Sequence, residues 1–153
     1  MSGAEIWGIE FNGEYKFTPE TEGFSVIASA STQKGTDKET NEDLSNINPY
    51  KLVTGLRYTS LDERLTSELI GTYVGEATTY SGVAPYNSEG YYTVDLLAKY
   101  QVNDQLNLSL GINNIFDEEY YQYQNIPYRA TSDSIKQYRE AGRNIQAQFK
   151  FTF

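Results

Sequence analysis

The sequence predicts an all-β fold: an antiparallel transmembrane β-barrel segment with about seven long strands that follow one another as a meander. Three observations predict it. Apolar and polar residues alternate in seven successive runs. Each run is about 10 residues long, which suits a tilted strand that crosses a bilayer in roughly 9–11 residues. The connections alternate between short and long, as in outer-membrane barrels with short periplasmic turns and long extracellular loops.

The first four runs establish the alternation. Successive side chains of a strand point to opposite faces, so each run separates into two sets. In Trp7–Phe17 the odd positions are apolar, aromatic or glycine, and three of the even positions are charged. Phe24–Ser31 and Tyr50–Tyr58 also keep one apolar face. In Leu65–Val74 the pattern is mixed, so this run is predicted as a strand without assigned faces.

The last three runs are Tyr92–Tyr100, Leu106–Asn113 and Asn144–Phe153. Each alternates an apolar set with a mostly polar one, and the last ends on three phenylalanines at every second position. Aromatic residues lie near several strand ends: Tyr15, Phe17, Phe24, Tyr50, Tyr58, Tyr92 and Tyr100. Such rings form the girdles of a membrane barrel, because tyrosine is apolar in its body and polar at its tip.

Charged side chains occupy the polar faces of these runs. The residues predicted to face the barrel lumen are Glu10, Glu14, Lys51, Arg57, Asp95 and Lys99. A Lys or Arg that faces lipid at the bilayer midplane costs about 2–4 kcal/mol. Their placement on one face therefore indicates a polar interior rather than catalysis.

The connections set the orientation in the membrane. The short ones are Thr18–Glu22, Ser60–Arg64 and Asn103–Gln105, and the long polar ones are Lys34–Pro49, Glu76–Gly90 and Asp117–Gly142. The short turns are expected in the periplasm and the long loops outside the cell. By this parity the last strand runs inward and Phe153 ends on the periplasmic side.

Composition excludes several classes of function. The chain has 12 Lys and Arg against 21 Asp and Glu, a net charge of −9, which argues against nucleic acid as a partner. It has no cysteine and no histidine, which removes the thiolate nucleophile, the commonest general base and the commonest transition-metal ligand. No phosphate-binding glycine pattern or nucleophile–base pair is visible. We expect a protein that is not an enzyme and has no cofactor.

The number of strands leads to a further expectation. Bacterial single-chain barrels have even strand numbers from 8 upward, and open edges in hydrocarbon leave unpaired backbone groups that cost several kcal/mol each. A hairpin within Glu118–Arg139 would add two strands and keep the number odd. The chain also opens without a secretory signal. We therefore expect a piece of a larger barrel.

Two segments near the C-terminus resemble TonB-dependent outer-membrane receptors. Gly111–Tyr120 reads G-I-N-N-I-F-D-E-E-Y and is similar to the family's G-x-x-N-L-F-D-x-x-Y, with Ile in place of Leu. Ala141–Asn144 reads A-G-R-N and resembles the P-G-R-N that opens the family's final strand, with Ala in place of Pro. Upstream, Ile47–Lys51, Gly55–Tyr58 and Tyr73–Gly75 fit the same receptors at matching spacing.

The resemblance implies that residues 1–153 are the C-terminal part of a receptor barrel, about the last third of 22 strands, with the plug domain and the earlier strands absent. It implies a bacterial outer-membrane location and active uptake of an iron-bearing ligand. The implied partners are outer-membrane lipid, the plug domain, TonB and the barrel-assembly machinery. This machinery would read Phe149, Phe151 and Phe153 as a C-terminal signal.

The resemblance also bears on the ligand. The segment from Pro49 through Gly90 is most similar to haem and haemoglobin receptors, and a siderophore receptor is the alternative. Those haem receptors commonly use histidine to ligate the haem iron. Because this chain has no histidine, such a ligand would lie outside it.

The longest loop holds the candidate ligand contacts. Aromatic and Arg residues are enriched in binding hot spots, and this loop contains Tyr120, Tyr121, Tyr123, Tyr128, Arg129, Tyr138 and Arg139. The alternative is an aromatic girdle with loop packing. Asp117, Glu118 and Glu119 form an acidic run, but neighbouring strand residues point apart, whereas a cation needs convergent oxygens at about 2.3–2.6 Å. A solvated strand-to-loop transition is the preferred interpretation.

Two other functions stay open from the residues alone. One is a small autonomous outer-membrane barrel that acts as an adhesin or anchor. The other is a soluble antiparallel β protein that binds a partner through its tyrosine-rich loops, since half-buried strands of a soluble sheet also alternate.

Overall fold

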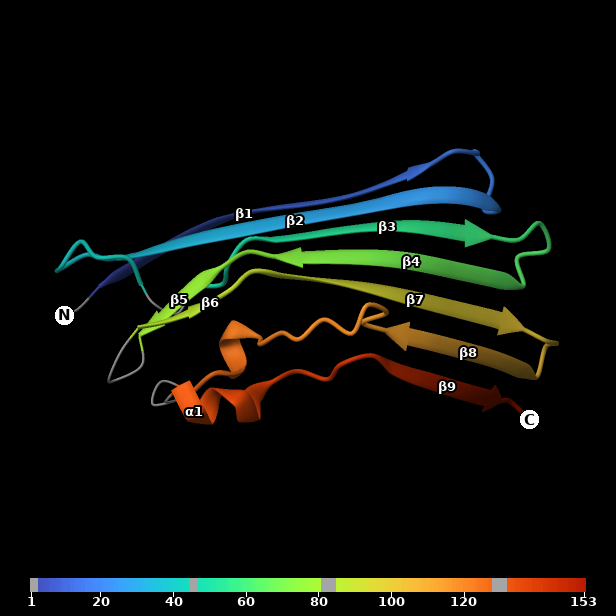
Figure 1. The fold of residues 1–153 in the computed structure, drawn as a ribbon. Helices are drawn as coiled ribbons and strands as arrows, with labels where there is room; N and C mark the ends of the chain where they lie inside the picture. The colour runs from blue at the N-terminus through green and yellow to red at the C-terminus, as the bar shows by residue number, and fades with distance from the viewer. Residues whose placement is uncertain (1–2, 45–46, 81–84, 128–131) are drawn as a thin grey trace.

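The computed structural model describes residues 3–44, 47–80, 85–127 and 132–153, and for residues 78–80, 85–87, 132 and 133 it describes the backbone only. Seven strands form one antiparallel sheet in chain order (Figure 1). They are β1 (Ala4–Lys16), β2 (Gly23–Asp37), β3 (Lys51–Thr59), β4 (Leu65–Val74), β7 (Tyr91–Gln101), β8 (Leu106–Asn113) and β9 (Asn144–Phe151). The predicted all-β meander of seven long strands is therefore confirmed.

Smaller elements lie in the long connections. The strands β5 (Ala77–Tyr80) and β6 (Pro85–Ser88) pair as a separate two-stranded sheet. The last long connection contains η1 (Tyr123–Asn125), α1 (Ser132–Ile135) and η2 (Lys136–Tyr138). Over the part of the chain that is described, no helix is both long enough and apolar enough to cross a membrane.

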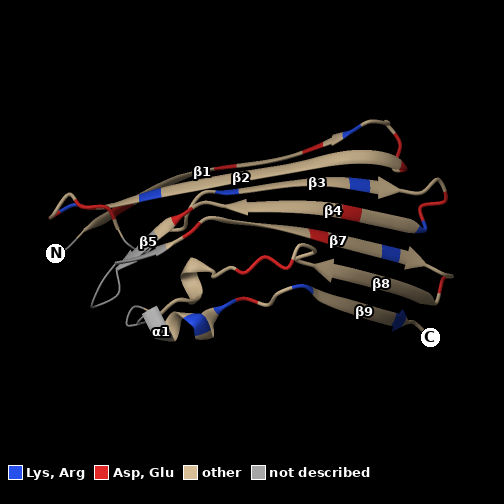
Figure 2. Cartoon of the chain, viewed as in Figure 1, with Lys and Arg blue, Asp and Glu red and all other residues tan. Residues whose placement is uncertain are grey.

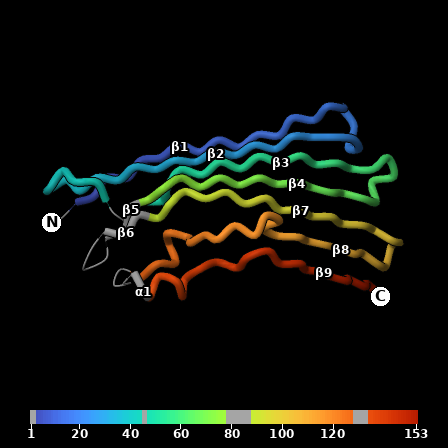
Figure 3. The backbone as a smooth tube through the Cα atoms, viewed as in Figure 1, coloured from blue at the N-terminus to red at the C-terminus, as the bar shows by residue number. Residues whose placement is uncertain are grey.

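Short and long connections lie at opposite ends of the sheet. The tube view shows the three tight turns and the C-terminus at one end, and the long connections with the N-terminus at the other (Figure 3). The strands β1 and β9 are the edges of this sheet. Because the sheet has an odd number of antiparallel strands, these two edges run in the same direction.

One face of the sheet is apolar across its full width. Directly paired residues of an antiparallel sheet point to the same side. One such row crosses five strands, from Phe11 through Ala30, Leu52 and Tyr73 to Tyr92. This is the aromatic and aliphatic face that the alternation predicts.

The opposite face is polar and holds the predicted lumen charges. Here Lys16, Ser25, Arg57, Glu68 and Leu97 form one row across β1, β2, β3, β4 and β7. The same registers place all six charged residues predicted to face the lumen on this side. Over the middle of the strands, charges are sparse, and most lie in the turns and loops at the two ends (Figure 2).

The pairing assigns the faces of β4, which the sequence leaves open. Leu69 pairs with Leu56 and Leu96 on the apolar face. Ile70 pairs with Gly55 and Asp95 on the polar face. Two adjacent apolar residues therefore belong to opposite faces, which is why the alternation of this run looks mixed.

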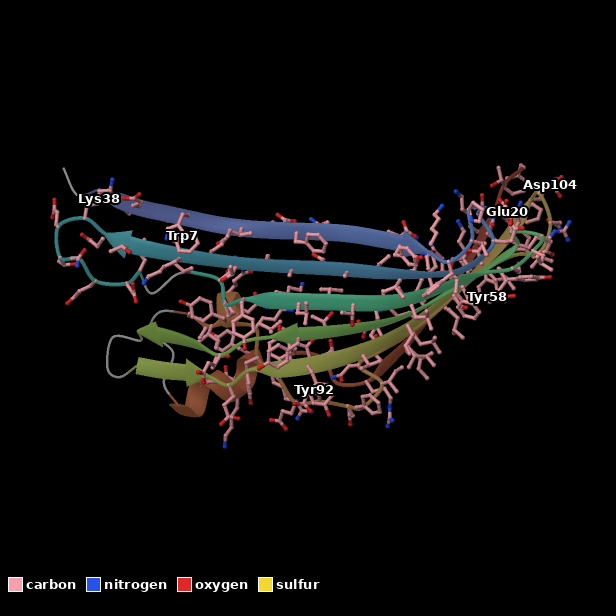
Figure 4. The ribbon with its side chains drawn as sticks, turned by 90° about the horizontal axis from the view of Figure 1, so that it is seen from above. Trp7, Glu20, Lys38, Tyr58, Tyr92 and Asp104 are labelled. Atoms are coloured by element: carbon pink, nitrogen blue, oxygen red, sulfur yellow. The ribbon has the colours of Figure 1, made fainter. Side chains whose placement is uncertain are left out.

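The apolar face has no covering layer. Phe11 is 59% exposed, Ile145 69% and Phe149 75%, whereas Ile126 and Ile135 are the only buried hydrophobic residues among those described. Side chains project from the sheet, with Trp7 toward the long-connection end and Tyr58 toward the turn end (Figure 4). Exposed apolar surface this extensive indicates contact with lipid, because a water-soluble sheet would bury it.

Three connections differ between the structure and the sequence-based expectations. The second run continues to Asp37, so the loop predicted from Lys34 to Pro49 begins four residues later, at Lys38. The connection Glu76–Gly90, predicted as a long polar loop, contains the β5–β6 pair. Among its described residues, Glu118–Arg139 contains short helices and one isolated bridge, from Tyr121 to Arg139, and no paired strands.

Candidate functional site

A tight turn at Asn114–Asp117 begins the last long connection. Asn114 has a left-handed backbone (φ 51°), which asparagine tolerates better than most residues, and is only 3% exposed. Its side-chain oxygen accepts the Glu118 N–H at 2.9 Å, and its amide donates to the Glu118 carbonyl at 2.8 Å. Its own N–H donates to Asp95 Oδ1 at 2.7 Å, which ties the turn to β7.

The far end of the connection docks on the same turn. Asp117 is also left-handed (φ 59°), and its carboxylate accepts the Arg143 N–H at 2.7 Å. A Cβ at Gly142 would lie 2.5 Å from Asp117 Oδ1, so a larger residue here would displace the carboxylate that accepts the Arg143 N–H. The two segments that carry the family resemblance thus meet here and close the base of the loop. We call Asn114, Asp117, Gly142 and Arg143 the latch.

The acidic run does not converge. Asp117 belongs to the latch, whereas Glu119 lies 3.4 Å from Arg139 Nη1 and accepts the Tyr121 hydroxyl at 3.3 Å. No group of three or more acidic side chains among the described residues is arranged to hold a metal ion. Asp117 is exposed at this strand-to-loop transition and also has a structural contact, the hydrogen bond from the Arg143 N–H.

Above the latch the loop turns toward the polar face. Tyr120 stacks on Tyr91 with ring centroids 4.3 Å apart, and Tyr91 pairs with Val74 in the polar-face row that includes Lys51. Burial, together with the nearby carboxylates of Glu140 and Asp95, raises the pKa of Tyr120 above its ordinary value. The phenol therefore stays neutral at physiological pH and acts as a packing group.

Further along the loop, polar contacts hold it over the sheet. The Gln124 amide donates to Asn48 Oδ1, which joins this loop to the segment before β3. Asn125 Nδ2 donates to Glu140 Oε1 at 2.6 Å. Ile126 and Ile135 pack together with Tyr121. The described part of the loop therefore has its own small core and a fixed position.

A cavity of about 300 Å³ lies between this loop and the polar face of the sheet. It is lined by Ser31, Asn48, Pro49, Lys51, Val74, Tyr91, Gln122, Tyr123 and Gln124. Lys51 is the only charged residue in this lining. We call this cavity the mouth cavity, because it lies at the long-connection end of the sheet.

The predicted contact residues have different positions. Tyr123 lines the mouth cavity, and Tyr120, in the same loop, stacks on Tyr91 of the sheet. Tyr121 and Arg139 form the bridge in the loop stem, and Tyr138 is half-buried in η2. Tyr128 and Arg129 lie outside the described residues.

Sequence reasoning placed Lys51 on the lumen face but named neither it nor several other cavity residues as ligand contacts. Lys51 and Tyr91 are each the first residue of a strand that follows a long connection, and both belong to the polar face. Loop length and strand parity together could have placed them at the mouth. Asn48 and Gln124 carry no such signal, because their contact joins positions 76 residues apart.

A second polar region occupies the turn half of the sheet. Arg57 Nη1 lies 2.9 Å from Glu14 Oε1, and Arg57 Nε lies 2.6 Å from Glu68 Oε1. Ser25 Oγ donates to Glu14 at 3.0 Å. The concave surface beside this network encloses about 790 Å³ and is lined by residues of β3, β4, β7, β8 and β9.

Phe149 and Phe151 lie on the apolar face of β9 at the turn end, and Phe153 follows the end of this strand. Phe149, Phe151 and Phe153 are 75%, 54% and 107% exposed. Phe151 and Phe153 meet edge to face with centroids 5.1 Å apart.

Known proteins resemble this chain in sequence and in architecture. The model of the TonB-dependent receptor-like β-barrel family matches residues 2–115. The ferric-pyoverdine BN7/BN8 receptor of Pseudomonas putida is 29% identical over 148 residues, which are 95% of this chain and 16% of that protein. The haem/hemopexin utilization protein C of Haemophilus influenzae is 26% identical over 124 residues, 78% of this chain and 17% of that protein.

A solved structure agrees in fold. The copper transporter OprC superposes with a TM-score of 0.80 at 20% identity, covering 98% of this chain and 24% of OprC. The chain therefore spans about a sixth of the length of the two curated relatives named above. The matched family model, together with the seven-stranded sheet and its lipid-facing side, shows that this chain belongs to the TonB-dependent receptor β-barrel family of the bacterial outer membrane.

Proposed function

We propose that this chain is the C-terminal wall of an outer-membrane receptor that imports an iron-bearing ligand. The observation that carries the proposal is the two-sided sheet: an uncovered apolar face toward lipid and a charged concave face toward a lumen. Two relatives are named for ferric pyoverdine and for haem, both of which carry iron. Iron is the cargo in this proposal and not a resident cofactor.

The concave face fits a plug domain as its partner. It offers a polar surface with both charge signs, which suits a folded domain that must stay hydrated and move. Transport would then proceed when TonB, energised from the inner membrane, pulls on that plug. The proposed plug and the remaining strands belong to the receptor outside residues 1–153.

The type of ligand remains a prediction. The segment Pro49–Gly90 resembles haem and haemoglobin receptors, and we keep haem as the favoured ligand with a siderophore as the alternative. Relatives of both kinds match the chain over more than three quarters of its length. Among the tyrosine and arginine candidates in the described part of the chain, Tyr123 lines the mouth cavity.

Deletion of the gene tests the proposed function. Cells without it should grow poorly in iron-limited medium when ferric pyoverdine or haemin is the sole iron source, and a plasmid copy should restore growth. Growth that is unchanged by the deletion on both iron sources would contradict the proposal.

We also propose that Phe149, Phe151 and Phe153 are read by the barrel-assembly machinery. Their uncovered rings at the turn end support this role. Phe153→Ala should reduce the amount of receptor in the outer membrane, measured by immunoblot, whereas Thr152→Ala should not. Equal amounts of both variants would count against a terminal signal.

A further inference from the structure

The floor of the mouth cavity is a single row of paired residues. Ser31, Lys51, Val74 and Tyr91 pair directly across β2, β3, β4 and β7. All four side chains therefore leave the sheet on its polar face at the same height. A rigid sheet thus sets the position of each group in the floor.

The roof of the cavity is the loop segment Gln122–Gln124. Two contacts fix it: the Tyr120–Tyr91 stack on one side and the Gln124–Asn48 hydrogen bond on the other. The latch closes the loop base below them. The roof is therefore held at a defined distance from the floor, as a small binding site requires.

The chemistry of the lining selects for negative charge. Lys51 is the only charged group in the lining, although the chain has a net charge of −9. No carboxylate of the described ranges forms an ion pair with the Lys51 ammonium within 4.0 Å. The remaining polar groups are neutral amides and hydroxyls, which can donate hydrogen bonds to an oxygen anion. A positive point charge among neutral donors fits one anionic oxygen group.

We propose that the mouth cavity binds a carboxylate or phenolate group at the periphery of the imported ligand, with Lys51 supplying the charge. This inference rests on the proposed function. It assigns the cavity to the organic part of the ligand and not to the iron. Such a group can belong to a siderophore or to haem, so both serve as probes.

The test uses the whole receptor in energy-depleted cells, where binding is separated from transport. Equilibrium binding of radioactive ferric pyoverdine and of radioactive haemin is measured for wild type, Lys51→Gln, Lys51→Arg and Lys99→Gln. Lys99 is the matched control because it is a lysine on the same face at the turn end. Binding is divided by the amount of receptor in the membrane, so poor folding does not count as weak binding.

For the probe that wild type binds, Lys51→Gln should weaken binding by about tenfold, the loss of one charge-assisted hydrogen bond. Lys51→Arg and Lys99→Gln should stay close to wild type. The difference between wild type and Lys51→Gln should shrink in high salt, because salt screens exposed charges.

The outcomes separate the two proposals. If wild type binds neither probe, the proposed iron uptake fails. If wild type binds a probe and Lys51→Gln binds it equally well, iron uptake stands and the role of Lys51 is wrong. A weakening by Lys51→Gln that high salt leaves unchanged would overturn the electrostatic role.

Discussion

Asn114 shows at the scale of one residue how the outer loop is anchored. Its left-handed backbone and its two side-chain hydrogen bonds to Glu118 are satisfied in a site that is only 3% exposed. Leaving buried polar partners unsatisfied is costly. These contacts explain why the family motif has asparagine at this position: its side chain shapes the turn from which the loop leaves the barrel.

Asn114→Ala should destabilise the receptor by about 1–3 kcal/mol, because two backbone groups of Glu118 lose their partners. Asn114→Gly can still adopt the left-handed backbone but also lacks the side-chain hydrogen bonds to Glu118. This variant should therefore be destabilised too. Urea unfolding of the purified receptor in detergent measures the change. Asn107→Ala is the control, because Asn107 lies on β8, the strand that leads into this turn, and has no left-handed backbone. Equal stabilities for Asn114→Ala and Asn107→Ala would contradict the role of the turn.

A second prediction for a single residue concerns Arg57. Its side chain is 34% exposed and bridges Glu14 and Glu68, so solvent screens the network and its net stabilisation should be at most about 1 kcal/mol. Arg57→Gln leaves two carboxylates close together, and adding Glu68→Gln should restore part of the loss. A double-mutant cycle in urea measures this coupling. Strictly additive effects would show that the pair does not interact.

At the scale of one strand, β4 tests which face meets lipid. Leu69 lies on the apolar face, whereas Ile70 pairs with Asp95 on the polar face. Leu69→Lys should therefore cost about 2–4 kcal/mol in the membrane. Ile70→Lys should cost much less, because the lysine faces water and an opposite charge. Unfolding from lipid bilayers compares the two adjacent variants, and equal costs would be inconsistent with a two-sided wall.

Strands were predictable from sequence because alternation is local. Trp7–Phe17 and Asn144–Phe153 reveal their faces without any partner. The faces of Leu65–Val74 could not be predicted from sequence, because they depend on pairing with β3 and β7. The Arg57–Glu14 ion pair, 43 residues apart in sequence, and the mouth cavity likewise require the register and the loop path. The loop tyrosines were identified as candidates from composition, but composition could not tell which of them lines a cavity.

At the scale of the whole molecule, the sheet has the properties of a barrel wall rather than of a water-soluble domain. It buries almost none of the large side chains on its apolar face. Its short turns and long connections lie at opposite ends (Figure 1). Its edges, β1 and β9, run in the same direction, so an all-antiparallel closure requires an odd number of further strands between them. Lipid outside and a hydrated lumen inside account for both faces at once.

Thiol labelling along β7 tests this two-sided wall most directly, because the chain contains no cysteine. Single cysteines are placed at Val94, Asp95, Leu96 and Leu97 of the receptor in outer membranes and exposed to a small water-soluble thiol reagent. We predict rapid labelling at Asp95 and Leu97, which face the lumen, and little labelling at Val94 and Leu96, which face lipid. Equal labelling at all four positions, or the reverse alternation, would contradict the account.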